Sequence, residues 1–334
     1  MKINEKLILI DSFGRVAKKL RISVTDRCNF TCIFCMPSQP IWIPKNEILT
    51  FEEIERLVRI FVDLGIEKVK LTGGEPLVRN DIELLIEKIS NIQGIKSISI
   101  TTNGYFLPDK AFKLKEAGLK SVTISFHSLD KEKFNSVVGK NVYERVLKGI
   151  DTALDAGFES VKMNTVIIRG YNENEILDLI EFARDRNLIL RFIEYMPFDG
   201  LHLWDLSKVV TGKEILDIIK KKYDFEEKPR ENGSTSQNYR FKDGKGEFGI
   251  ITSISRPFCS DCDRIRLKAD GKLVPCMFSK DEYDLKTPLR KGASDEEIKN
   301  LIRTYYYRKF AGVEKLINAQ LLPKHIRPMH TIGG

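Results

Sequence analysis

The chain is 334 residues long, with 42% hydrophobic residues, 31% charged residues and a formal net charge of +8. It can therefore bury a sizeable core, either as two ordinary domains or as one large α/β domain. The longest apolar run near the N-terminus, residues 7–10, is too short for a signal peptide or a membrane span, so we expect a cytoplasmic protein. The positive charge would suit a nucleic acid, an anionic membrane or a polyphosphate, and equally a solvated basic surface.

Short segments rich in Val and Ile alternate with helical patterns between residues 19 and 194. The pattern after Thr50 is typical of a helix, because Thr50 and Glu53 form a capping box before an apolar stripe that ends at Gly65. Further helices are predicted at 81–90, 109–117, 142–156 and 173–186. Strands are predicted at Leu20–Thr25, Lys68–Thr72, Ile95–Thr101, Ser121–Ser125, Ser160–Ile167 and Leu188–Glu194.

Six successive strand and helix pairs predict an α/β fold with a parallel sheet, as an incomplete (β/α)6 TIM-type barrel or an open doubly wound sheet. In either fold the chemistry is expected at the carboxyl ends of the strands. The alternation stops near residue 200, so we expect the barrel over 1–235 and a C-terminal α+β extension over 236–334. Beyond that point we predict a helix at 212–222, an exposed loop or linker at 227–240, a strand at 248–254 and a helix at 294–309.

All six cysteines fall into two triplets: Cys28, Cys32, Cys35 and Cys259, Cys262, Cys276. Disulfides would leave one thiol of each triplet unpaired, so metal or cluster ligation is the expected use. The first triplet, spaced C-x-x-x-C-x-x-C, follows the first predicted strand, and three thiolates would leave one iron of a four-iron cluster open. A zinc site would need a distant fourth ligand from His127, His202, His325 or His330.

The second predicted strand ends in the sequence TGGEP, residues 72–76. Its two glycines allow close approach of the backbone to a ligand, and the Glu75 carboxylate can accept from an ammonium group. A cysteine loop of this spacing followed by a GGE turn resembles the radical S-adenosylmethionine (SAM) superfamily. The resemblance implies a 4Fe-4S cluster on the first triplet and SAM at its open iron, where reductive cleavage gives methionine and a 5′-deoxyadenosyl radical.

The second triplet lies in FCSDCDRIRLKADGKLVPCMF, residues 258–278. Gly271 predicts a hairpin turn that folds Cys276 back toward Cys259 and Cys262. Three thiolates again leave a ligand position open, and a zinc knuckle with a different fourth ligand is the alternative.

The motifs occur in an order that closely resembles the GTP 3′,8-cyclase family of molybdenum cofactor biosynthesis, from about residue 11 to 334. They are DSFGR (11–15), LRISVTDRCNF (20–30), TGGEPLVR (72–79), TTNG (101–104), RFIEYMP (191–197), the second cysteine segment and the terminal Gly-Gly. The resemblance implies a radical lyase in which the deoxyadenosyl radical takes hydrogen from the ribose 3′ carbon of GTP. The resulting carbon radical attacks guanine C8, and reduction of the product radical then gives 3′,8-cyclo-7,8-dihydro-GTP. It also implies a second 4Fe-4S cluster, on whose open iron the guanine docks.

The resemblance assigns individual residues by position. Both cysteine triplets become cluster ligands, and catalytic roles are implied for Arg21, Gly333 and Gly334. The SAM site is expected at Phe34 (through its backbone), Gly73, Gly74, Glu75, Ser125 and Met196. The GTP site is expected at Arg21, Lys68, Lys70, Thr101, Lys162, Arg191, Arg264 and Arg266, where arginine forks and lysine point charges suit a triphosphate.

Three positions depart from the family pattern. Phe34 stands where tyrosine is common, Lys70 replaces an arginine fork by a point charge, and His127 stands where an acidic residue is expected. Another radical SAM enzyme with an auxiliary cluster, such as a peptide-maturing enzyme, is the alternative function, and a basic nucleic-acid binder with metal knuckles is a second one. The favoured interpretation has no nucleic-acid or membrane partner. It implies a homodimer, a flavodoxin- or ferredoxin-type electron donor, and cyclic pyranopterin monophosphate synthase downstream.

Overall fold

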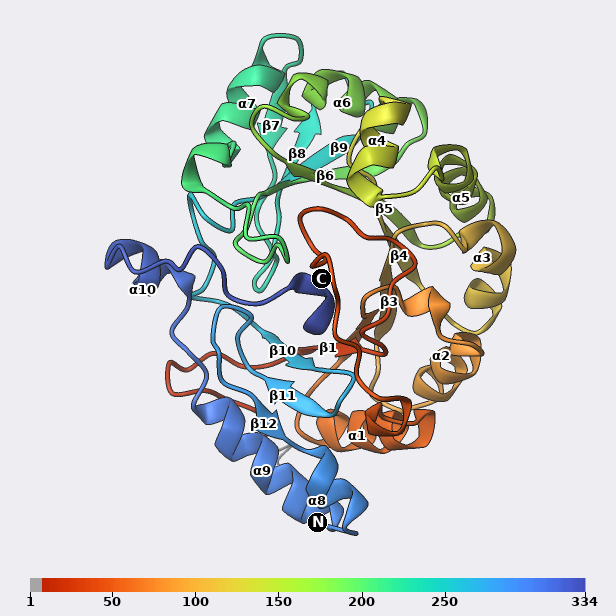
Figure 1. The fold of residues 1–334 in the computed structure, drawn as a ribbon, viewed down its shortest axis with the longest axis vertical. Coiled ribbons are helices and arrows are strands. Elements are labelled where there is room, and N and C mark those ends of the chain that lie inside the picture. Colours follow the sequence, from red (N-terminus) through yellow and green to blue (C-terminus); the bar gives the residue numbers. More distant parts are fainter. Residues whose placement is uncertain (1–7, 334) are drawn as a thin grey trace.

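A single twelve-stranded sheet forms the centre of the computed structural model, which describes residues 8–333. Its strand order is β12-β11-β10-β1-β2-β3-β4-β5-β6-β9-β8-β7. The sheet curves around a central space, and the helices lie around its outside (Figure 1). The six central strands are parallel: β1 (Lys19–Ser23), β2 (Lys68–Thr72), β3 (Ser97–Thr102), β4 (Ser121–Ser125), β5 (Ser160–Ile167) and β6 (Ile189–Glu194).

The predicted α/β fold, an incomplete barrel with a C-terminal extension, is confirmed. The outer helices are α1 (Phe51–Asp63), α2 (Ile82–Ser90), α3 (Leu107–Glu116), α4 (Lys131–Val138), α5 (Tyr143–Asp155), α6 (Ile176–Asp185) and α7 (Gly212–Lys220). The capping box at Thr50 is also confirmed, since its hydroxyl accepts from the Glu53 N–H and the Glu53 carboxylate accepts from the Thr50 N–H. Helix α4 was not predicted, because it is short and buries only Phe134, Val137 and Val138.

The two faces of each central strand differ in chemistry, because alternate side chains point to opposite faces. On β1, Leu20 and Ile22 are fully buried in the core that packs beneath the helices. Arg21, on the other face, lines the central space. The strands therefore turn an apolar face to the helices and a polar, largely cationic face to the interior.

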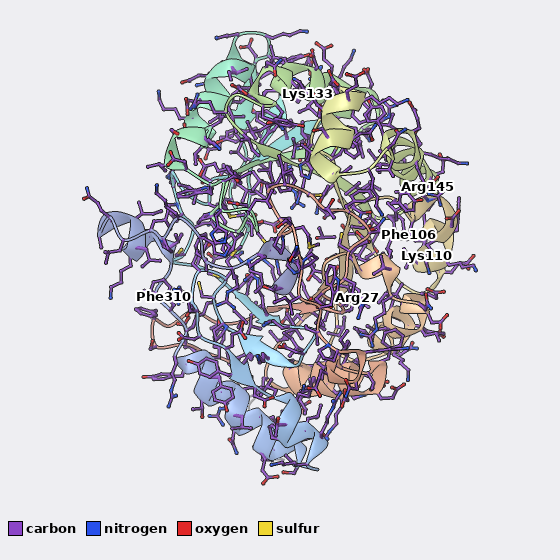
Figure 2. The ribbon with its side chains drawn as sticks, viewed as in Figure 1. Arg27, Phe106, Lys110, Lys133, Arg145 and Phe310 are labelled. Carbon is purple, nitrogen blue, oxygen red and sulfur yellow. The ribbon has the colours of Figure 1, made fainter. Side chains whose placement is uncertain are left out.

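The outside of the molecule carries ion pairs of the ordinary kind. Lys110 pairs with Glu83 at 3.5 Å, and Arg145 pairs with Asp109 (Figure 2). Such exposed pairs each contribute roughly 0 to 1 kcal/mol to stability. Among residues 8–333, no helix is long and apolar enough to cross a membrane.

The chain beyond β6 extends both edges of the parallel sheet. Strand β9 (Glu247–Ile251) pairs in parallel with β6, and β10 (Arg264–Leu267) pairs in parallel with β1. The antiparallel strands β8 (Gln237–Phe241) and β7 (Phe225–Glu227) continue one edge, while β11 (Lys272–Val274) and β12 (Tyr283–Asp284) continue the other. The last helices are α8 (Lys286–Arg290), α9 (Asp295–Tyr307) and α10 (Val313–Asn318). The division at residue 235 stays a prediction.

The prediction of an exposed loop over residues 227–240 is confirmed for residues 229–232, which are exposed and lie outside any strand, and is wrong at both ends. Glu227 ends β7, and residues 237–240 lie in β8. In between, Gly233 and Ser236 are buried, and the Gly233 carbonyl accepts from Lys19 Nζ at 2.9 Å and Arg264 Nη1 at 2.8 Å. This part of the loop therefore packs against cationic side chains through the Gly233 backbone carbonyl.

Candidate active site

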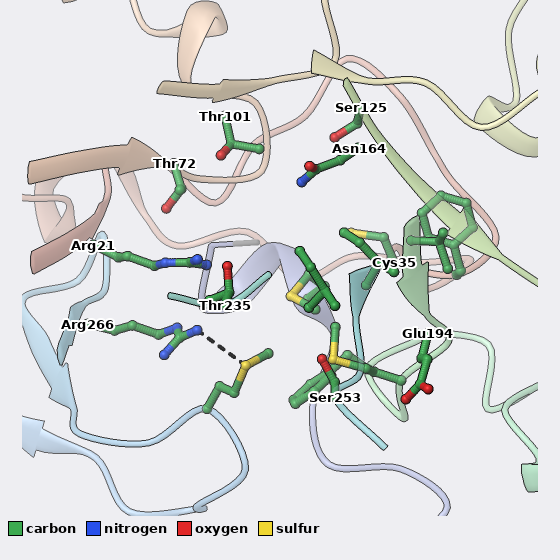
Figure 3. Close-up of a pocket in the computed structure, with 18 of the residues that line it drawn as sticks. Arg21, Cys35, Thr72, Thr101, Ser125, Asn164, Glu194, Thr235, Ser253 and Arg266 are labelled. Carbon is green, nitrogen blue, oxygen red and sulfur yellow. Dashed lines mark hydrogen bonds between the residues drawn. The ribbon is translucent and has the colours of Figure 1, made fainter. Parts of the chain in front are cut away.

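One cavity at the carboxyl ends of the central strands is lined by all six cysteines (Figure 3). The first triplet lies in the loop after β1, and the second flanks the β10–β11 hairpin. The predicted turn exists: β10 and β11 pair antiparallel with Arg266 opposite Val274, and Gly271 has a φ of +75°. Two cysteine motifs more than 220 residues apart in sequence therefore face the same space, since Cys35 and Cys259 both line it.

The GGE turn fits tightly against the first cysteine loop. A Cβ at Gly74 would lie 2.4 Å from the Arg27 carbonyl oxygen, and one at Gly73 would lie 2.5 Å from the Thr25 carbonyl oxygen. The N–H groups of Gly74 and Glu75 donate to these same carbonyls at 2.8 Å. Only glycine allows this approach, so Gly73 and Gly74 have a structural role in holding the cysteine loop. This role is separate from any contact that they make with a ligand in the cavity.

Glu75 is buried and already has several hydrogen-bond donors. Its carboxylate accepts from the Thr102 hydroxyl at 2.7 Å, the Asn103 N–H at 2.6 Å and the Leu77 N–H at 3.0 Å. Burial nevertheless raises the pKa of Glu75 to about 7. The side chain thus fixes the turn after β3 as well as lining the cavity.

The six thiols are free, and their arrangement fits cluster ligation. Burial, together with the neighbouring Glu75 carboxylate, raises the pKa of Cys28 to about 12, and burial raises that of Cys35 to about 12. Over residues 8–333, no three His, Cys, Asp or Glu side chains are grouped to hold one metal ion. Cluster thiolates each bind a different iron, so they need not converge on one point as zinc ligands must.

Cys262 lies in a different electrostatic environment. Its burial alone would raise the thiol pKa, but the positive charges of Arg264 and Lys309 lower it to about 6. The second triplet thus sits among cations, whereas the first sits beside the Glu75 carboxylate. The second triplet is therefore the one whose surroundings stabilise added negative charge.

Cations from several strands meet inside the sheet. The register places Arg21 beside Lys70 on β2 and beside Arg266 on β10. On the opposite side, Arg191 donates to Asn164 Oδ1 at 3.0 Å and to the Thr123 hydroxyl at 3.3 Å. Among the residues that the structure describes, no carboxylate forms an ion pair with any of the group that we call the inner cations: Arg21, Lys70, Lys162, Arg191 and Arg266.

Burial lowers the pKa of each inner cation, and repulsion by neighbouring cations lowers it further for all of them except Arg191. The pKa of Arg21 falls well below its usual range through burial and through the charges of Arg266, Arg264 and Arg191. Burial and Arg191 lower the pKa of Lys162 to about 8, and burial lowers that of Arg191 to about 10. Arg266 also has a buried Nε without a hydrogen-bond partner. Arg266 is buried and the other inner cations are partly buried, and cations grouped in this way without carboxylate partners are typical of a site for a polyanionic ligand.

The chain matches known proteins over almost its whole length. The family model described as "Radical SAM superfamily" matches residues 22–183, and "Molybdenum Cofactor Synthesis C" matches residues 188–314. The GTP 3′,8-cyclase of Aquifex aeolicus is 49% identical over 85% of this chain and 89% of its own length. The mitochondrial GTP 3′,8-cyclase of Arabidopsis thaliana is 41% identical over 98% of this chain and 84% of its own length.

The chain belongs to the GTP 3′,8-cyclase family. As a family member and a radical SAM protein, it is an enzyme whose cofactors are SAM and 4Fe-4S clusters. Among solved structures, Streptococcus suis SuiB bound to precursor peptide SuiA has a TM-score of 0.61, with 16% identity, over 87% of this chain and 68% of that chain. At this identity the likeness concerns the fold alone.

Most residues that the family resemblance assigned line the cavity. Besides the cysteines, they are Arg21, Phe34, Gly73, Gly74, Glu75, Thr101, Ser125, Met196, Arg264 and Arg266. Lys70, Lys162 and Arg191 lie deeper within the sheet, where Arg191 contacts the lining residue Asn164. Lys68 begins β2, so it lies toward the amino end of that strand, and it is exposed.

The C-terminal tail reaches the GGE turn. The N–H groups of Ile326 and Met329 donate to the carbonyls of Pro197 and Phe198, and the tail ends in the middle of the curved sheet (Figure 1). A Cβ at Gly333 would lie 2.1 Å from the Thr72 hydroxyl oxygen. Gly334 lies outside the described residues.

Sequence reasoning missed several lining residues, among them Asn164, Thr235 and Ser253. Asn164 could have been found from its position two residues after Lys162, on the same face of β5. His127, noted as a departure from the family pattern and as one of four histidines that a zinc site could use, also lines the cavity. Its Nδ1 accepts from the Val166 N–H at 3.2 Å, and burial lowers its pKa to about 4, so its Nε2 carries the hydrogen as a neutral donor.

The inner cations predict a particular pH dependence of stability. The pKa of Lys162 is about 8 in the folded chain against an ordinary 10.5, so between about pH 8 and pH 10.5 the unfolded chain binds more protons at this site. Stability relative to a Lys162→Met variant should therefore increase from about pH 7.5 to about pH 10, as measured by urea midpoints. Lys120→Met, which removes a surface partner of Glu159, is the matched control. A pH-independent difference between wild type and Lys162→Met would contradict the assignment.

Proposed function

We propose that this enzyme converts GTP to 3′,8-cyclo-7,8-dihydro-GTP in a SAM-dependent radical reaction, the first step of molybdenum cofactor biosynthesis. The observation that carries the proposal is one cavity that both cysteine triplets line together with Arg21 and Arg266 of the inner cations. The other inner cations, Lys70, Lys162 and Arg191, each stand two residues before a lining residue of the same strand. A triphosphate, a guanine base and a radical source each require one of these three features. Membership of the GTP 3′,8-cyclase family supports the same substrate.

The first triplet and the GGE turn would hold one cluster with SAM. When bound, the cluster and SAM supply the one-electron radical chemistry, and the residues of the chain bind and orient the reactants. The Gly73 and Gly74 backbone and the Glu75 carboxylate would orient the methionine end of SAM. Ser125, Met196 and the Phe34 backbone would enclose the rest of the cofactor and exclude water.

The second triplet and the inner cations would hold GTP. Arg264 and Arg266 lie on the strand beside the second triplet, where they would orient the guanine base. Arg21 lies beside Arg266 in the strand register. Lys70, Lys162 and Arg191 would bind the phosphates together with Thr101. Lys68, at the exposed amino end of β2, would contribute only to the outermost phosphate. The ribose would then lie between the two cysteine sites.

We further propose an electron donor, a downstream enzyme and an oligomeric state for this enzyme. Radical formation consumes a strongly reducing electron, so we infer a flavodoxin- or ferredoxin-type donor in a reducing cytoplasm. The cyclic product would pass to cyclic pyranopterin monophosphate synthase. Assembly as a homodimer and the division of the chain at residue 235 are parts of the same proposal.

The proposed function is tested by turnover of the reconstituted enzyme. After anaerobic reconstitution with iron and sulfide, SAM, a strong reductant and GTP should give the cyclic product and 5′-deoxyadenosine, both detected by mass spectrometry. Cys276→Ala should keep the first cluster, with about half of the iron, and lose GTP turnover, because the second site lacks one of its three thiolates. If 5′-deoxyadenosine forms equally without GTP, or if Cys276→Ala cyclises GTP fully, the proposal fails.

The close approach of Gly333 to Thr72 predicts a role for the C-terminal tail in turnover. Gly333→Ala places a methyl group against the Thr72 hydroxyl at a residue with a φ of +75°, so the tail must leave the GGE turn. We expect turnover to fall by about tenfold or more, with cluster content unchanged, because misplacement of groups near reacting atoms is costly. Gly292→Ala is the matched control, since Gly292 has a φ of +83° and no neighbour in the way. Equal turnover in both variants would contradict a role of the tail in the active site.

A further inference from the structure

Lys309, just beyond α9, packs against the second cysteine triplet and is 2% exposed. Its Nζ donates to the carbonyls of Cys262 and Arg264, both at 2.9 Å, and lies 3.4 Å from Cys262 Sγ. The Tyr306 hydroxyl is a fourth contact at 3.3 Å. Among the described residues, no carboxylate forms an ion pair with this ammonium group. Its charge is thus directed at the cysteine loop.

Neighbouring contacts fix Lys309 in this position. Arg15, which pairs with buried Asp11 at 2.6 Å, donates to the carbonyls of Cys259, Phe310 and Ala311 at 3.0, 2.8 and 2.7 Å. The backbone at Gly312 also lies against Cys259, because a Cβ there would be 2.4 Å from Cys259 Sγ. The DSFGR motif at residues 11–15 therefore ties the segment after α9 to the second triplet.

Among the described residues, no cationic side chain donates to a sulfur of the first triplet. Cys28 Sγ accepts from the Phe30 N–H at 3.4 Å and from the Asn103 side-chain amide at 3.9 Å, and both donors are neutral. The nearest charged group that acts on Cys28 is the Glu75 carboxylate. The two cysteine sites therefore differ in the sign of the charge beside them.

We propose that Lys309 raises the reduction potential of the cluster on the second triplet by donating a charged hydrogen bond to the Cys262 sulfur. One-electron reduction adds a negative charge to the cluster, and a buried ammonium group at a ligand sulfur stabilises that charge. Hydrogen bonds to the sulfurs and local charge are among the factors that set such potentials. Lys309 is thus a positioning and tuning residue. The proposal rests on the proposed function only in requiring a cluster at this site.

The test is an anaerobic dithionite titration followed by electron paramagnetic resonance. It uses the full chain with Cys28, Cys32 and Cys35 changed to Ala, so that the second cluster alone contributes to the signal. Lys309→Met should shift the midpoint to a more negative potential, and Lys309→Arg should keep it near that of the unchanged Lys309. The matched control is Arg308→Met, which removes an exposed positive charge one residue away and should leave the midpoint unchanged.

The outcomes separate this proposal from the proposed function. Equal midpoints in Lys309→Met and Arg308→Met would overturn the role of Lys309. If Lys309→Met fails to retain the cluster, Lys309→Gln, which keeps a neutral donor, should still have a more negative midpoint than Lys309→Arg, and equality would again overturn the role. Failure of the chain with an unchanged Lys309 to hold any second cluster would instead contradict the two-cluster premise of the proposed function.

Discussion

The constraint on which the rest of this structure depends is a group of cations that are at least partly buried and have no carboxylate partner among the described residues. Arg21, Lys70 and Arg191 stand on neighbouring or facing strands. Burial lowers the pKa of all three, and repulsion by nearby cations further lowers the pKa of Arg21 and Lys70. An unpaired charge in a protein interior is expensive, and several like charges together are more so. The free enzyme therefore carries a destabilising feature that a bound polyanion would relieve. The apolar face of the same strands, packed beneath the helices, supplies the compensating stability.

The geometry of the sheet brings the remaining parts of the site to these cations. Parallel strands place the first cysteine loop and the GGE turn at one edge, where Gly73 and Gly74 permit backbone contact between them. The chain beyond β6 then adds β9 and β10 to opposite edges of the parallel sheet. Because β10 leads directly into the hairpin before Cys276, this arrangement turns the second triplet toward the first. The site is thus a consequence of how the C-terminal region joins the sheet.

Much of this architecture could be predicted from the sequence, because periodicity and caps are local. The bounds of β2, β4 and β5 follow from short β-branched runs, and α1 follows from the Thr50 capping box. Pairing between distant segments has no such local signal. The polar stretch around Gly233 was therefore taken for an exposed loop, although its carbonyl binds Lys19 and Arg264. The contact of Lys309 with Cys262, 47 residues away, was not predicted for the same reason.

The central claim is that the inner cations hold a triphosphate between the two cysteine sites. It is tested most directly by calorimetric binding of GTP and of guanosine to the reconstituted enzyme at low and high salt. We predict that GTP binds at least about tenfold more tightly than guanosine, and that this advantage narrows as salt screens the phosphates. Equal affinities for GTP and guanosine at low salt would contradict the account.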